Sequence, residues 1–507
     1  MGYQSVFRYI VEHLQGDYLP DDFTLPRENK ELEVFDDGAV DGINIYHLER
    51  PVITEEDGDK ILQAINAASE GEYDSAEEIF FYLGDKYRII NIIDDIQECI
   101  LENTTSKNAG KLYSFAIHMM VESKHIECVK AAMVIAEMFK NDREVKQIIR
   151  ILGLSDEFTV FSIFVMRNWE NRNIEDYNLA RKLNGWGKIH AVSFVKPENQ
   201  EIENWFLTEG IKNNVMPEYS ALNCFIKGNV RNRLDCEDMS YEEFHAICKI
   251  INALLQDEPV PGISEIDDPQ ETIIRLLNHS EDLMPLDIDD YEILFRILEW
   301  LETGDNRNKT DLKFRINQIL YHPACRKLVE EQVQQGRHIG LARNLGIPYK
   351  EQLYSKMEED FDEYYKEVQY LMDDAEYIGK VLNLFRRKLP LEDMATGASR
   401  EHGIGEEYED YRKLDTLLRE FDNHAGLGLD FMEVAFRSPV IKVRNTAIIV
   451  IHNWVDYTRR PLQKISPGMC EILQRVKEDE VIEDFKEQMD LMLDGAQSFE
   501  WDWKKHH

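Results

Sequence analysis

A short sequence that occurs twice is the feature that most constrains the fold. Residues 179–183 read LARKL and are followed by Asn184 and Gly185, and residues 341–345 read LARNL and are followed by Gly346. Each segment resembles the end of an amphipathic helix that a glycine stops. A unit that recurs along a chain is typical of stacked helix pairs. The sequence therefore predicts repeated helices, and it does not by itself identify a molecular activity.

Most of the chain after residue 58 has the periodicity of helices. Apolar residues return every three or four positions, and charged residues lie on the opposite side of each helix. Helices this short are stable only when they pack on neighbours. We therefore expect an all-α protein, a HEAT-like α-solenoid. Its repeats are degenerate, because no strict period of about 40 residues is visible.

Breaks in the periodicity divide the chain into parts. The first is an irregular arm in which residues 36–38 turn a short β-hairpin and residues 42–47 alternate as a strand would. Clusters of Pro, Gly and Asp mark two later loops. The predicted parts are the N-terminal arm (1–58), a first helical array (59–255), a linker loop (256–270), a second array (271–389), a Gly-containing loop (390–408), C-terminal HEAT-like helices (409–494) and an aromatic, acidic tail (495–507).

The charge of the chain excludes some classes of partner. The sequence contains 97 Asp and Glu residues against 58 Lys and Arg residues, a formal net charge of -39. Affinity for nucleic acids depends on Lys and Arg, and anionic membranes attract basic segments, so neither is an expected partner. Solubility alone explains such a charge. A protein partner of basic character also suits it.

Cysteine usage and the N-terminus indicate a cytoplasmic protein. The seven Cys residues include no C-x-x-C pair, which is typical of reduced thiols. The first residues lack the apolar core of a signal peptide. The longest apolar stretch, residues 446–455, is too short to span a bilayer, so no membrane association is expected.

One late motif is similar to a known repeat family. Residues 438–447 resemble the second helix of a HEAT or armadillo repeat, with Pro439, Val443, Arg444 and Ala447 in the family's positions. The same residues make physical sense without the resemblance. Proline suits the start of a helix, and a small alanine lets two helices approach closely.

Three motifs resemble one bacterial family of HEAT-like proteins. These are residues 185–190 (GWGKIH), 205–210 (WFLTEG) and 438–440 (SPV). Some members of that family are labelled limonene hydroxylase. The resemblance implies a helical-repeat fold and, through the label, a monooxygenase that acts on a terpene.

The residues that such chemistry needs are not recognisable in the sequence. No Cys lies in a haem-binding loop, and Gly403 and Gly405 lack the third glycine of a dinucleotide-binding motif. Two Glu-x-x-His spacings of the di-iron type occur, and chance explains that number. They are Glu122 with His125 and Glu242 with His245. We therefore predict no cofactor.

Two groups of residues have metal-binding chemistry but not a metal-binding spacing. The first lacks the paired knuckle of a zinc site, and buried thiols explain it better. The second lacks EF-hand spacing, and an Asp-Gly turn explains it. The two groups are Cys224, Cys236, His245 and Cys248, and Asp36, Asp37, Asp41 and His47. No metal site is predicted.

The predicted function is that of a non-catalytic scaffold whose stacked helices hold a protein partner. Trp and Arg dominate the binding energy of protein interfaces, and the glycines around Trp186 suggest an exposed turn. The predicted partner-contact residues are Trp186, Lys188, Trp205, Arg444 and Asn445. The alternative is an enzyme, either the monooxygenase of the family label or a hydrolase.

Overall fold

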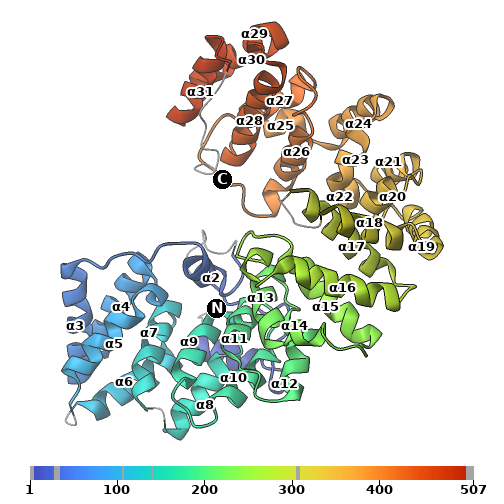
Figure 1. Ribbon diagram of the computed structural model, residues 1–507. Coiled ribbons are helices and arrows are strands. Elements are labelled where there is room, and N and C mark those ends of the chain that lie inside the picture. The colour runs from blue at the N-terminus through green and yellow to red at the C-terminus, as the bar shows by residue number, and fades with distance from the viewer. Residues whose placement is uncertain (1–4, 28–34, 106–107, 140, 304–308, 498–507) are drawn as a thin grey trace. The chain divides into compact units, whose positions relative to one another are not determined.

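A computed structural model describes residues 5–27, 35–105, 108–139, 141–303 and 309–497 (Figure 1). Every regular element in this part of the chain is a helix, and its β pairings are isolated bridges. The all-α prediction is therefore confirmed. The chain forms two compact units, which are unit 1 (Met1–Ile319) and unit 2 (Leu320–His507).

Unit 1 contains the first helices of the chain, of which the last, α18, reaches one residue beyond it. They are α1 (Val6–His13), α2 (Ala39–Tyr46), α3 (Glu55–Glu70), α4 (Tyr73–Tyr87), α5 (Ile93–Asn103), α6 (Ala109–Glu122), α7 (Ile126–Ala136), α8 (Arg143–Leu152), α9 (Asp156–Met166), α10 (Arg172–Ala180), α11 (Trp186–Phe194), α12 (Gln200–Trp205), α13 (Glu218–Lys227), α14 (Val230–Arg233), α15 (Tyr241–Leu254), α16 (Pro269–Asp282), α17 (Ile288–Thr303) and α18 (Lys309–Leu320).

The helices of unit 1 bury their apolar faces on one another. Helix α3 packs on α4, α6 on α7, α9 on α11, and α15 on both α13 and α17. Several helices begin where a side chain accepts a hydrogen bond from a free backbone N–H group, as Thr54, Asp142 and Ser240 do. Local capping thus sets the helix limits, and packing between pairs stabilises them.

Unit 2 is built in the same way. Its helices are α19 (Pro323–Val333), α20 (Ile339–Asn344), α21 (Lys350–Glu359), α22 (Phe361–Tyr364), α23 (Gln369–Met372), α24 (Ala375–Lys388), α25 (Leu391–Met394), α26 (Glu409–Arg419), α27 (Leu429–Phe436), α28 (Ile441–Thr458), α29 (Leu462–Ile465), α30 (Pro467–Val476) and α31 (Glu483–Leu493). Helix α28 lies in the core, where the indole N–H of Trp454 donates to the carbonyl of Phe421.

The repeated LAR motif ends a helix in both units, as predicted. Leu179 and Ala180 are buried at the end of α10, and Leu341 and Ala342 are buried in α20. Gly346 has a positive φ of 63° and so provides the glycine stop after α20. In unit 1 the chain instead continues through Gly185 into α11.

The predicted strand at residues 42–47 is wrong, because this segment belongs to α2 and its C-cap. Gly38 has a φ of 79° at the N-cap, so the Asp-Gly turn leads into a helix rather than a hairpin. A Cβ at Gly42 would lie 2.2 Å from Cε3 of Trp186. Helix α2 therefore lies directly against that indole, a contact that local alternation does not reveal.

The predicted loop at 256–270 lies inside unit 1. It joins α15 to α16. Helix α15, which precedes the loop, packs on α17, which follows it in the sequence. The two units instead separate between Ile319 and Leu320, at the end of α18. Of the predicted tail, residues 498–507 lie outside the described part of the chain.

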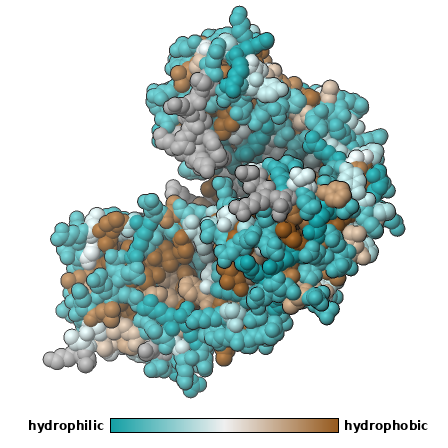
Figure 2. All heavy atoms as spheres, in the orientation of Figure 1, coloured by the Kyte–Doolittle hydropathy of each residue, from teal (hydrophilic) through white to brown (hydrophobic). Residues whose placement is uncertain are grey.

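Hydrophilic residues cover most of the visible surface, and apolar residues gather in a hollow over α4 and α7 (Figure 2). A hollow of about 250 Å³ at these helices is lined by Pro26, Phe81 and Ile126 among others, and Phe81 is 44% exposed. Among the described residues, no helix combines the length and the apolar character that a membrane span requires.

Candidate functional site

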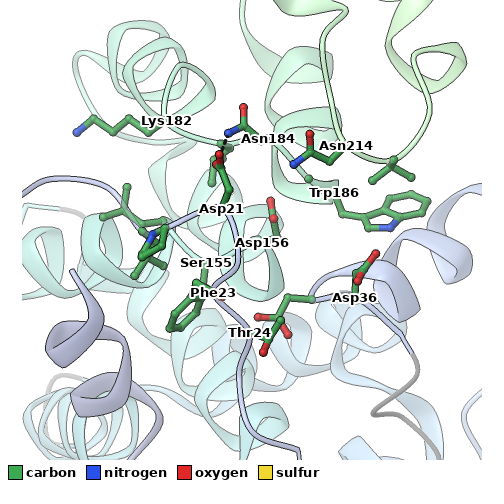
Figure 3. Close-up of a pocket in the computed structure, with 17 residues that line it drawn as sticks. Asp21, Phe23, Thr24, Asp36, Ser155, Asp156, Lys182, Asn184, Trp186 and Asn214 are labelled. Carbon is green, nitrogen blue, oxygen red and sulfur yellow. Dashed lines mark hydrogen bonds between the residues drawn. The ribbon is translucent and has the colours of Figure 1, made fainter. Parts of the chain in front are cut away.

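A polar hollow of about 220 Å³ opens in unit 1 (Figure 3). It lies between the part of the chain that precedes α2, which we call the N-terminal segment, and the starts of α9 and α11. Four segments line it: residues between 19 and 37, residues 154–156, residues 182–186, and residues 214–215. We call it the acidic pocket, because Asp21, Asp36, Asp37 and Asp156 all lie on its wall. Two motifs that the sequence indicated separately, Asp36-Asp37 and Gly185-Trp186, meet here.

Asp156 lies in the middle of the pocket, in a cradle of glycines. Its Oδ1 atom accepts a hydrogen bond of 2.7 Å from the backbone N–H of Gly187. A Cβ at Gly38 would lie 2.7 Å from the Asp156 carbonyl oxygen, and one at Gly185 would lie 2.3 Å from Oδ2. Only glycine lets the backbone approach this closely, so the carboxyl is held in place.

The carboxyl of Asp156 has no ion-pair partner among the described residues. Burial, together with repulsion from Asp37, Asp36 and Glu157, raises its pKa to about 7, although the Gly187 N–H favours the charged form. Burial and Glu157 likewise raise the pKa of Asp37 to about 7, against the attraction of Arg27. Carboxyl groups with raised pKa values in a pocket are characteristic of functional sites.

A buried ion network lies beneath the pocket and fastens the N-terminal segment to the helices. Its members are Arg27, Asp37, Asp41, Arg88, Glu127, Lys130 and Glu157. Lys130 is fully buried, and its Nζ lies 2.6 Å from Asp41 Oδ2 and 2.9 Å from Glu127 Oε1. Glu157 accepts from Arg27 Nη2 at 2.9 Å and from the N–H of Gly38 at 2.8 Å.

Opposite charges in the network offset the effect of burial on Lys130 and Glu157. Burial alone would lower the pKa of Lys130, but the carboxylates of Asp41, Glu127 and Glu157 raise it. Burial would raise the pKa of Glu157, but Lys130, Arg27 and Arg88 lower it to about 2. Balanced charges of this kind favour one position of the N-terminal segment, because any other position leaves a buried charge unpaired.

The ring of Trp186 lines the pocket on the α11 side and packs on other aromatic rings behind it. Trp186 is only 6% exposed and packs with its ring centroid 4.9 Å from that of Tyr219 and 6.2 Å from that of Tyr46. The ring of His190 stacks on Tyr46, and burial lowers the pKa of His190 to about 4, so this histidine is neutral. Figure 3 shows the indole beside Asp36 at the edge of the pocket.

All five predicted partner-contact residues are buried, with exposed fractions of 8% or less. Gly185 is the N-cap of α11, so the expected exposed turn around Trp186 is wrong. Lys188 lies inside the same helix, and Trp205 packs edge-on to Tyr177. Burial leaves these three side chains little surface for a partner, and only Trp186 lines the acidic pocket.

Arg444 and Asn445 lie in α28 of unit 2. The guanidinium of Arg444 binds both carboxylate oxygens of Glu480, and it also donates to the carbonyls of Ser438, Pro439 and Ser399. These contacts hold the start of α28 to the preceding loop. Arg444 thus stabilises this part of unit 2.

The residues that the sequence offered as possible metal ligands lie at several separate sites in unit 1. Glu122 binds Arg8 and the ring of His125 packs on Phe81, whereas His245 lies against Asp290. Among the described residues, the two Glu-x-x-His pairs therefore share no cluster. Asp37 and Asp41 pair with cations of the buried network, and His47 contacts the Tyr219 hydroxyl.

Comparison with known proteins gives no match: no family model matches the sequence, and neither a curated protein nor a solved structure matches it. Function is therefore inferred from the geometry of the site.

Sequence reasoning missed the central residue of the pocket, Asp156, and the buried partners Lys130 and Glu157. The signal that was present is the Gly-Trp-Gly motif, since two glycines two residues apart at the start of a helix indicate a close neighbour. Here the neighbour is the Asp156 side chain, which both Gly185 and Gly187 touch.

Proposed function

We propose that the protein is a non-catalytic scaffold, and that the acidic pocket of unit 1 binds a basic side chain of a protein partner. The helix pairs of unit 1 are proposed to form a HEAT-like array that supports the pocket. The observation that carries the proposal is Asp156, a rigidly held carboxyl in an open pocket, close to Asp36 and Asp37 and without a cation.

A guanidinium or ammonium group in the pocket would relieve the repulsion between the carboxyl group of Asp156 and those of Asp36 and Asp37. A hydrogen bond to a charged group contributes about 1.5–3 kcal/mol, and a guanidinium binds a carboxylate with two parallel bonds. Arginine therefore fits better than lysine. The volume of about 220 Å³ is below the roughly 300–1,000 Å³ of pockets for drug-sized ligands, and it suits a single long side chain.

The other polar groups of the pocket are compatible with a cationic guest. Asn184 donates to Asp21 Oδ1 at 2.7 Å, which orients that carboxylate. Lys182 lines the pocket, but its Nζ binds Asp17 at 2.7 Å, and Figure 3 shows the side chain directed away from the centre. Lys182 therefore does not neutralise Asp156.

The net charge supports a basic partner at longer range. A charge of -39 attracts basic molecules and speeds their association, and salt screens the effect. The acidic run at residues 358–363 contributes less than its sequence suggests, because Glu358 binds Arg387 and Asp362 binds Lys413. The acidic pocket is therefore the better candidate for a specific contact.

The test uses a defined cation and its neutral analogue. N-acetylarginine amide and N-acetylcitrulline amide are titrated into the full chain by calorimetry or NMR. We expect the arginine compound to bind and the citrulline compound to bind at least about tenfold more weakly, since citrulline has nearly the same shape but an uncharged urea with fewer N–H donors. Equal binding of both compounds would show that the pocket does not recognise a cation.

Variants link the binding to the pocket and to a protein partner. Asp156→Asn removes the central charge and keeps an acceptor for Gly187, while Asp59→Asn removes the same charge from an exposed position on α3. A partner captured from cell extract at low salt should be lost with Asp156→Asn and retained with Asp59→Asn. Retention by both variants would overturn the proposal.

A further inference from the structure

A second cluster of ionisable groups lies on α15 and α17, outside the acidic pocket. His245 Nδ1 is 2.8 Å from Asp290 Oδ1 and 3.5 Å from Asp287 Oδ2. One possible ligand atom from each of the three residues lies within 4.8 Å of the other two. Their sequence separation hides the cluster, because the histidine and the Asp290 carboxylate are 45 residues apart.

Tyr241 orients both carboxylate residues. Its hydroxyl donates to Asp290 Oδ2 at 2.8 Å and accepts from the backbone N–H of Asp287 at 2.7 Å. The N–H of Asp290 in turn donates to Asp287 Oδ1 at 3.0 Å. One oxygen of each carboxylate is thus held from outside, and the other faces the imidazole. Groups that surround metal ligands orient them in this way.

We propose that His245, Asp287 and Asp290 bind a divalent first-row transition-metal ion. Distances of 2.8 and 3.5 Å from the imidazole nitrogen to the two carboxylate oxygens suit an ion that makes bonds of about 2.0–2.2 Å to nitrogen and oxygen. One imidazole and two carboxylates are ligands that such ions accept, and their charges balance a dication. The remaining coordination positions are left to water.

The cluster differs in its charge balance from the other acidic group of unit 1. Asp41, Glu127 and Glu157 surround Lys130, which already neutralises them. No Lys or Arg in the described part of the chain forms an ion pair with Asp287 or Asp290.

Solvent reaches the cluster from one side. The side chains of Asp287 and His245 are 45% and 24% exposed, while Asp290 is fully buried. An ion can therefore approach without movement of a helix. It takes the lone pair of Nδ1 and replaces the hydrogen bond between His245 and Asp290.

Helix capping is the alternative role of these residues, since Asp287 caps the start of α17. The test therefore uses a variant that keeps the cap. Asp287→Ser retains a side-chain oxygen for the Asp290 N–H but removes one ligand. Asp289→Asn is the matched control, because Asp289 is exposed on the same helix and the substitution removes the same charge.

The full chain is freed of metal with a chelator and titrated with Zn²⁺ by calorimetry and with Co²⁺ by visible absorption. We expect a single ion to bind, and both Asp287→Ser and His245→Gln to weaken binding at least about tenfold. Tyr241→Phe should weaken it about ten- to a hundredfold through the orientation of the carboxylates. Asp289→Asn should bind as the wild type does.

Two results would overturn the proposal. One is the absence of Zn²⁺ and Co²⁺ binding to the folded wild-type chain. The other is binding that Asp287→Ser and His245→Gln leave unchanged, because such binding belongs to other residues. Circular dichroism of each variant separates loss of the ion from loss of the fold.

Discussion

Lys130 and Glu157 are both buried, and the Nζ atom of the lysine lies 2.5 Å from Oε1 of the glutamate. The pair joins α7 to α9 at the point where the N-terminal segment is fastened. Asp41 completes the contact from α2. A single lysine thus connects three parts of unit 1.

Replacing this lysine should destabilise unit 1 strongly. Lys130→Met keeps the apolar length of the side chain but leaves Asp41 and Glu157 without their central cation. Loss of one partner of a buried ion pair costs about 3–5 kcal/mol. Urea unfolding, followed by circular dichroism, measures the change. Lys249→Met, at an exposed position on α15, is the control and should change the free energy of unfolding little.

The pH dependence of stability should reveal Asp156. Its pKa is about 7 in the folded chain against an ordinary value of 3.8, so the folded state retains a proton that the unfolded state has released. The contribution of this group is complete below the ordinary value and is lost as pH rises through 7. Asp156→Asn removes the titration.

The melting temperature of Asp156→Asn relative to wild type should therefore increase between pH 5 and pH 8. At pH 8 we expect Asp156→Asn to raise the free energy of unfolding by about 1–2 kcal/mol. This gain is smaller than the whole pKa shift implies, because Asp37 titrates over the same range. A difference in melting temperature that does not change with pH would contradict the assignment of the raised pKa to Asp156.

The affinity of the acidic pocket for a cation should depend on the same ionisation of Asp156. It should rise with pH, whereas the stability contribution of Asp156 falls with pH. Asp156 and Asp37 ionise near pH 7, so the affinity for N-acetylarginine amide should rise between pH 6 and pH 8. Glu157, with a pKa of about 2, is ionised throughout and adds no pH dependence. Calorimetry at constant ionic strength measures the effect. An affinity that is flat or falls with pH would argue against these two carboxyls as the binding groups.

Two glycines should respond to alanine with opposite signs. A Cβ at Gly42 would lie 2.2 Å from the Trp186 ring, and overpacking of this kind costs about 1–3 kcal/mol. Gly58 lies inside α3 with no atom near its missing Cβ, so Gly58→Ala should stabilise the helix by about 0.5–1 kcal/mol. Thermal unfolding compares the two variants. Equal effects would mean that α2 does not pack on Trp186.

The helices could be predicted because their signals are local. Apolar periodicity, caps and glycine stops lie within each segment, as the buried apolar faces of α6 and α8 illustrate. Residues 42–47 were mistaken for a strand, since Ile43 and Ile45 alternate with polar residues. The packing of this segment on Trp186, far along the chain, is not visible in the local sequence.

The sites could be predicted only in part, because they depend on contacts between distant residues. The sequence indicated Asp36, Asp37 and Trp186 but not that they share a pocket with Asp156. Charged residues are normally exposed, so nothing in the sequence marks Lys130 as buried. His245 was considered with nearby cysteines, whereas its neighbours are carboxylates on another helix.

The fastening of the N-terminal segment has a consequence for how the chain is made. Arg27 and its partner Glu157 are 130 residues apart, so the segment leaves the ribosome well before α9 exists. Long separations of this kind slow folding, and domains otherwise fold from the N-terminus during synthesis. The N-terminal segment therefore reaches its native place only after α9 has been made.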